Sequence, residues 1–324
     1  MMFSPNNPSP YGKSIILTVR SKIGTDGRVP KSAQPWPSEP DFISLELFSP
    51  EGGFESEEAI NEFLMKYMPQ GEKPRFPKPV KPWHKAQEAA YAGWKKKSAR
   101  GRSNAAEKAL SLSSDTPDAY LLLAHDSPSW EEALDLENQA LKAAQEILQI
   151  QRYEENPGPY WGEAITRPYM RSVFAIGYSS WKSGQGDAAR ERFRELLSKN
   201  PEDNQGARYL LAAILLEKGE YGEIRRLMAQ YMDDGLCHWS FNKALLHFRR
   251  RGDDPAGWDL LRQALLRNRH VPAYLSGKIS ISSLEMDSIE PGKEDEAREY
   301  TSIFQNAWKM VPGAVDWIKH YSRV

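Results

Sequence analysis

The residues of this chain that could do chemistry are few and scattered. Its 324 residues contain six histidines and one cysteine, Cys237. A single cysteine excludes an intrachain disulfide and a multi-cysteine zinc site. His238 and His247 stand nine residues apart, too far for neighbouring turns of one helix, and no His-Glu-x-x-His string exists. We therefore expect solvent-facing or hydrogen-bonded histidines and no metal site.

Two further patterns could suggest catalysis. Cys237 and His238 are adjacent, so on a helix they point about 100° apart and cannot act as nucleophile and base. A buried thiol is the better expectation. The acidic pairs Asp253-Asp254 and Glu57-Glu58 fall at a turn and at a helix start, where capping explains them.

A third pattern lies near the amino terminus. Gly12-Lys13-Ser14 resembles the end of a phosphate-binding loop, but it precedes a predicted strand where it should follow one. An enzyme within residues 1–70 is a further hypothesis, but this stretch contains no recognisable set of catalytic residues. The sequence thus predicts no catalytic residues, no cofactor and no enzyme activity.

One stretch is strongly basic. Residues 73–102 contain ten lysines and arginines against one acid, although the net charge of the whole chain is -1. Such an excess can contact phosphates, which predicts as an alternative function an adaptor that binds RNA or an anionic surface. The favoured interpretation is a solvated linker and helix end, where lysines offset the helix dipole. The candidate anion contacts are Lys95, Lys96, Lys97, Arg100 and Arg102.

The elements that must position any site are helices. Within residues 170–201, Gly177 falls in a first helix, Gly184 in a turn, and Ala189 and Phe193 in a second helix. Small residues let two helix backbones approach, and a large apolar residue fills the space beside them. We therefore predict that Gly177 and Ala189 are buried at a helix–helix contact.

The same unit recurs along the chain. Turn glycines Gly184, Gly219 and Gly252 are spaced 35 and 33 residues apart. This spacing is typical of the tetratricopeptide repeat, a pair of antiparallel helices of about 34 residues. One such unit cannot bury its own apolar face, so neighbours must stack on it.

The fold class that we predict is mostly α, a tetratricopeptide-like solenoid of helical hairpins with a small N-terminal α+β appendage. The array covers residues 84–324, its best repeats are residues 170–271, and an atypical unit caps its C-terminal end. A proline-rich basic linker, residues 71–83, precedes the array. Thr166 is expected to cap a helix, with Pro168 in its first turn.

Residues 1–70 form the predicted α+β module. Strands are expected at Ile15–Arg20 and Phe42–Phe48, because both runs are rich in β-formers and the second alternates. A helix is expected at Glu57–Met68 with Ser56 as its N-cap.

The C-terminal part carries a more specific likeness. Its most specific string is residues 268–275, Asn-Arg-His-Val-Pro-Ala-Tyr-Leu, followed by Gly292–Ala297, Tyr300, Ala307-Trp308-Lys309 and Pro312-Gly313-Ala314. Over roughly the last 160 residues, this pattern resembles the suppressor-of-tumorigenicity-seven family and related uncharacterised bacterial repeat proteins. The resemblance implies a helical repeat scaffold and supplies no catalytic residues. Membrane segments expected of the animal proteins are absent from this sequence.

A solenoid of this kind predicts a non-catalytic scaffold that binds a peptide or helix of a partner protein in a concave groove. The residues expected to line the groove are Arg171, Phe174, Tyr178, Trp181, Lys182, Tyr209, Trp239, Asn242 and Arg249. An aromatic and basic groove suits a partner segment with acidic and apolar residues. Phe174 and Tyr178 stand where proteins that clamp chaperone tails have lysine and asparagine, so we predict binding of internal segments.

Composition places the chain among ordinary globular proteins, with 40% hydrophobic and 27% charged residues. The longest apolar run is eight residues, Tyr209–Leu216, far short of a membrane span. The amino terminus lacks the pattern of a secretory signal. We therefore expect a cytoplasmic protein.

Overall fold

The fold is an array of helices. The structure, a computed structural model, describes residues 28–36, 39, 56–68, 82–148, 160–281 and 289–322. These residues form fourteen α-helices and three short 3-10 helices, with no strand among them. The predicted helical solenoid is therefore confirmed. The two strands predicted for the N-terminal module lie outside the described residues, so the α+β appendage stays a prediction.

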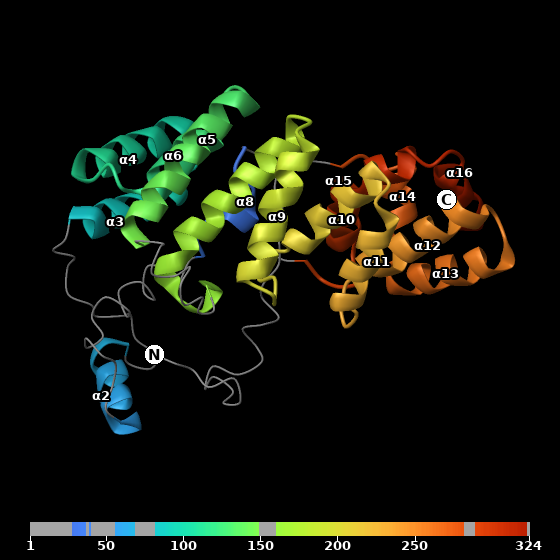
Figure 1. The fold of residues 1–324 in the computed structure, drawn as a ribbon, viewed down its shortest axis with the longest axis horizontal. Helices are drawn as coiled ribbons and strands as arrows, with labels where there is room; N and C mark the ends of the chain where they lie inside the picture. The colour runs from blue at the N-terminus through green and yellow to red at the C-terminus, as the bar shows by residue number, and fades with distance from the viewer. Residues whose placement is uncertain are drawn as a thin grey trace.

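The helices of the array follow one another as hairpins. Their bounds are α3 Pro82–Trp94, α4 Ala99–Leu112, α5 Pro117–His125, α6 Trp130–Leu148, α8 Arg167–Lys182, α9 Gly186–Lys199, α10 Ala207–Lys218, α11 Tyr221–Gln230, α12 His238–Arg251, α13 Pro255–Arg267, α14 Val271–Leu275, α15 Glu294–Lys309 and α16 Ala314–Ser322. The pairs α3/α4, α5/α6, α8/α9, α10/α11 and α12/α13 each pack together, and the array runs from α3 and α4 to α12, α13 and α16 (Figure 1).

The start of the array lies slightly earlier than predicted. Helix α3 begins at Pro82, inside the predicted linker of residues 71–83. Proline is tolerated in the first turn because its missing N–H would have no helical partner there. The rest of that linker lies outside the described residues.

Helix α2, Glu57–Tyr67, agrees with the sequence pattern. Ser56 is its N-cap, and its side chain accepts a hydrogen bond from the Ala59 amide at 3.2 Å. None of the residues of α2 is buried, and the helix lies apart from the array in Figure 1. Its apolar face is therefore only partly covered by the described part of the chain.

The repeat turns have the backbone geometry that glycine permits. Gly184, Gly219 and Gly252 have φ angles of 81°, 76° and 74°, in the left-handed region that other residues rarely adopt. Each ends the first helix of its hairpin, so the predicted repeat register is confirmed at all three turns.

The predicted close contact between α8 and α9 is also present. A Cβ atom on Gly177 would lie only 3.1 Å from the Phe193 ring and 3.2 Å from the Arg192 Cβ. Ala189 and Phe193 are both fully buried. The absence of a side chain at Gly177 is thus what lets the two helices meet.

One capping prediction was wrong. Thr166 precedes α8, and Pro168 lies in its first turn as expected, but the threonine side chain makes no cap hydrogen bond. Its hydroxyl instead shares its single proton between the carbonyls of Glu163, at 2.8 Å, and Tyr160. The 3-10 turns before α8 supply these carbonyls, so the hydroxyl holds the incoming chain rather than the helix amides.

The C-terminal helices do more than cap the array. Helix α16 packs on α12, α13 and α14, as an end cover would. Helix α15 instead packs back on α10, two hairpins earlier. None of the described helices is long and apolar enough to cross a lipid bilayer.

Candidate functional site

The predicted groove face is largely covered. Of its nine predicted residues, Trp181 is partly buried, and Lys182 and Arg249 are exposed. The others are buried, namely Arg171, Phe174, Tyr178, Tyr209, Trp239 and Asn242. The prediction that these six line an open groove was therefore wrong. Two segments distant in sequence cover them, one in each half of the array.

The first cover is the N-terminal segment, which we define as residues 28–36 together with Glu39. It contains the 3-10 helix η2, Lys31–Ala33, which packs on α8. The side chains of Val29 and Ala33 are fully buried and belong to the main hydrophobic core. The segment thus lies in the position where a bound peptide was expected.

Hydrogen bonds join this segment to the array through its backbone and through the Arg28 side chain. The Arg28 amide donates to the His125 carbonyl at 2.8 Å, and the Arg28 guanidinium donates to the Ser127 carbonyl at 2.7 Å. At the other side, the Gln205 amide group donates to the Ser32 carbonyl at 3.0 Å. The Gln205 contact holds a backbone carbonyl and does not depend on the side chain at that position, whereas the guanidinium contact is specific to Arg28.

A buried ion-pair cluster fixes the end of the segment. Arg171, 1% exposed, donates two hydrogen bonds to Asp118 on α5, at 2.6 and 3.0 Å, and a third to Glu39. The Tyr91 hydroxyl on α3 donates to the same Glu39 carboxylate at 2.8 Å. Gln87 donates to Asp118 from the other side.

The electrostatics of this cluster follow from its burial. Burial alone would lower the pKa of Arg171. The Asp118 and Glu39 carboxylates outweigh this effect and raise the pKa well above its ordinary value, so the guanidinium stays charged. Burial and then the Glu39 carboxylate raise the pKa of Tyr91, which remains a neutral donor. Arg171 and Tyr91 together therefore form a carboxylate-binding site that water does not reach.

Three members of this cluster could not be predicted from the sequence. Glu39, Tyr91 and Asp118 are single residues in segments without a motif, and Glu39 is 132 residues from Arg171. Asp118 lies in the first turn of α5, directly after Pro117, and is fully buried.

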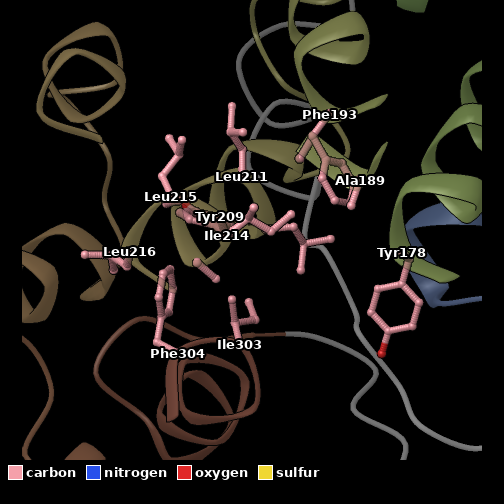
Figure 2. Packing of buried hydrophobic residues seen from close by; sticks show 14 of the residues in the cluster. Tyr178, Ala189, Phe193, Tyr209, Leu211, Ile214, Leu215, Leu216, Ile303 and Phe304 are labelled. Carbon is pink, nitrogen blue, oxygen red and sulfur yellow. The ribbon is translucent and has the colours of Figure 1, made fainter. Parts of the chain in front are cut away.

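The second cover is helix α15. Its Ile303 and Phe304 lie against α10 beside Tyr209, Ile214 and Leu216 (Figure 2). The Tyr300 hydroxyl donates to the Asn242 side-chain carbonyl at 3.0 Å and accepts from the Trp308 indole at 2.8 Å. The groove face of α10 and α12 is thus part of the core.

Two places keep predicted groove residues at the surface. The Lys182 ammonium lies 4.4 Å from the centre of the Trp181 ring, whose indole N–H donates to Glu217 at 3.2 Å. Arg249 lies 4.2 Å from the Tyr221 ring centre. It also borders a hollow of about 440 Å³ that is lined by Phe248, Arg249, Gly252, Met310, Val311 and Pro312.

The five predicted anion contacts fall into two groups in the structure. Lys95, Lys96, Lys97 and Arg100 are exposed around the turn between α3 and α4. Arg102 instead forms an ion pair with Asp126, with Nε and Oδ2 2.7 Å apart, and is only partly exposed, so its role as an anion contact stays a prediction. Its guanidinium also donates to the Lys96 carbonyl at 3.1 Å, which ties down the turn.

Comparisons with known proteins agree with this architecture. Residues 180–234 match the model of the tetratricopeptide repeat. These repeats generally mediate protein–protein interaction and are generally non-catalytic. The chain is thus an array of helical hairpins, of which residues 180–234 match the tetratricopeptide repeat.

Curated relatives share the likeness seen in the C-terminal motifs. The chain is 26% identical over 245 residues to the suppressor of tumorigenicity 7 protein-like of Bos taurus, across 68% of this chain and 44% of that protein. The human protein of the same name is 26% identical over 249 residues, across 70% of this chain and 43% of its own length. The chain therefore matches less than half the length of these relatives. No solved structure gives a significant match.

Proposed function

We propose that this protein is a scaffold that binds an extended, acidic segment of a partner protein across α3, α5 and α8, and that its own N-terminal segment occupies this site in cis. The observation that supports the proposal is the pairing of Glu39 with Arg171 and Tyr91. A carboxylate from a distant part of the chain enters a buried site that is otherwise built entirely by the array.

The N-terminal segment indicates the chemistry of the partner. A competing segment needs a carboxylate for Arg171 and Tyr91, and small apolar side chains where Val29 and Ala33 are buried. Its backbone carbonyl can accept from Gln205 as that of Ser32 does. This chemistry fits the acidic and apolar internal segment expected from the sequence.

The tether gives the cis segment a large advantage. A covalently linked ligand acts at an effective concentration of about 1 mM, so a free peptide at micromolar concentration will rarely displace it. The test must therefore weaken the cis segment inside the full chain. Val29→Asp with Ala33→Asp does this, because both side chains are fully buried against the array.

The experiment measures binding of a fluorescent peptide of residues 28–39 to the full chain by anisotropy. We expect at least tenfold tighter binding to the double variant than to the wild type. A peptide with Glu39→Gln is the ligand control, and Lys31→Ala, at a partly exposed position of η2, is the protein control. A folded double variant that binds neither peptide would show that residues 28–39 are a fixed part of the fold.

The exposed basic turn supports a second candidate function, contact with RNA or another anionic surface. Lys95, Lys96, Lys97 and Arg100 are all exposed on one turn. Binding through them would fall steeply as salt rises, because phosphate contacts release counterions. Binding of a partner segment in the buried cluster would depend far less on salt, so a salt titration separates the two functions.

A further inference from the structure

We propose that Cys237, His238 and Glu296 form a site for one divalent transition-metal ion, zinc being the best fit, between the start of α12 and the start of α15. One ligand atom from each of the three residues lies within 4.8 Å of the other two. All three side chains are at most 1% exposed. A thiolate, an imidazole and a carboxylate are the ligands that zinc uses in proteins.

The surroundings of His238 indicate a ligand independently of the distances among the three ligand atoms. Its side chain is 0% exposed, and neither ring nitrogen has a hydrogen-bond partner within the described part of the chain. The ring is held 4.2 Å from the Tyr209 ring centre and 5.4 Å from that of Tyr300, so it cannot turn toward water. A buried polar group without a partner is costly, and a metal ion would supply the missing partner.

Glu296 has the surroundings of an oriented metal ligand. Its Oε1 accepts from the Cys237 amide at 2.7 Å, and its Oε2 accepts from the Asn268 side chain at 2.8 Å and the Gly292 amide at 2.7 Å. Three donors from separate segments thus fix the carboxylate, as partners of metal ligands commonly do. Oε2 is saturated, which leaves the second lone pair of Oε1 on the side of Cys237.

The Cys237 thiol hydrogen-bonds to this carboxylate. On metal binding the S–H bond breaks, its proton leaves to solvent, and a sulfur–metal bond forms in its place. The metal ion keeps its oxidation state.

Glu299 adds a second carboxylate beside the site. It lies one turn after Glu296 on α15, is 1% exposed, and its Oε2 is 3.9 Å from the His238 Nε2. Three protein ligands leave a fourth position of a tetrahedral ion for Glu299 or a water molecule.

The test uses the full chain, freed of metal with a chelator and dialysed against zinc or cobalt(II). We expect one metal ion per chain by elemental analysis, and with cobalt(II) a thiolate charge-transfer band in the near ultraviolet. Cys237→Ser should abolish that band and weaken zinc binding at least tenfold. Zinc should also raise the melting temperature of the wild type and leave that of the variant unchanged.

The control variant is His247→Gln. His247 contacts Asp254 with Nε2 and Oδ1 2.7 Å apart, and both side chains are partly exposed, so it represents a histidine–acid pair outside the site. Its loss should leave metal stoichiometry and the cobalt band unchanged. A wild-type chain that retains no metal, or binds it without the thiolate band, would overturn the proposal even if Cys237→Ser failed to fold.

Discussion

The groove face of the repeats is covered twice along the array, and the two covers differ in kind. Over α8 lies a short segment that buries Val29 and Ala33 and one carboxylate. Over α10 and α12 lies a whole helix that buries several large side chains, among them Tyr300, Phe304 and Trp308. Both covers hide residues that the repeat pattern predicts at the surface.

This difference indicates which of the two covers a segment of a partner protein could displace. Hydrophobic stabilisation grows with the apolar area buried, so removing α15 would cost far more than releasing the N-terminal segment. That segment buries the small side chains of Val29 and Ala33, and its polar contacts include one carboxylate and the Ser32 carbonyl. A segment of another chain can reproduce such contacts. The packing of α15, in contrast, requires many side chains to fit closely together at the same time.

The largest effect should come from the C-terminal cover. Phe304→Ala should lower the free energy of unfolding by about 3–5 kcal/mol, because a fully buried aromatic ring leaves a cavity. Chemical denaturation followed by circular dichroism measures this. Met310→Ala is the control, since Met310 is 56% exposed just after the same helix. A loss below 1 kcal/mol would mean that α15 is itself a loosely bound cover.

A substitution in the N-terminal cover should change the free energy of unfolding by less. Glu39→Gln should cost about 1.5–3 kcal/mol, since it removes a charged acceptor from Arg171 and Tyr91. Ser32→Ala is its matched control, because only the Ser32 backbone carbonyl is held by the array and its hydroxyl has no partner within the described residues. Equal effects of the two substitutions would show that the carboxylate does not anchor the segment.

A pH dependence is expected from the contact between α6 and α8, the helix on which η2 packs. Burial raises the pKa of Glu137 on α6 to about 8, although the Ser179 hydroxyl donates to it at 2.8 Å. The unfolded carboxyl ionises near its ordinary pKa of about 4.3. The folded state therefore binds the extra proton between these values, and stability falls by roughly 1.4 kcal/mol per pH unit as pH rises from about 5 to 8.

Glu137→Gln should remove this slope, because the amide keeps the shape and an acceptor for Ser179 but cannot ionise. Melting curves of both proteins at pH 5, 6, 7 and 8 test this expectation. The variant should be the more stable protein at pH 8, and the two should converge near pH 5. Parallel curves would mean that the Glu137 carboxyl is already ionised in the folded protein.

The smallest effect on stability belongs to the exposed turn. Lys95→Glu with Lys97→Glu should change the free energy of unfolding by less than about 0.5 kcal/mol, since both side chains are exposed. If this turn contacts RNA, the same change should weaken RNA binding at low salt and reduce its salt dependence. Filter binding over a salt series provides the measurement. If the double substitution leaves RNA binding unchanged, these lysines do not contact RNA and are only a solvated helix end.

Local structure could be predicted from particular residues. Gly184, Gly219 and Gly252 required turns that only glycine forms easily, and they have positive φ angles. The small residues Gly177 and Ala189 required a close helix contact, which α8 and α9 make. These predictions succeeded because each depends on residues within one hairpin, where spacing along the chain determines distance in space.

The candidate site could not be predicted in this way. A repeat pattern indicates which face of a helix points inward, and it contains no information on what covers that face. Glu39 meets Arg171 across 132 positions, and Glu296 reaches Cys237 across 59. The sequence by itself thus determined the hairpins, their turns and their register, through short-range sterics and apolar periodicity. Only the tertiary structure decided which distant segments fill the groove, because that choice depends on burying charge and shape together.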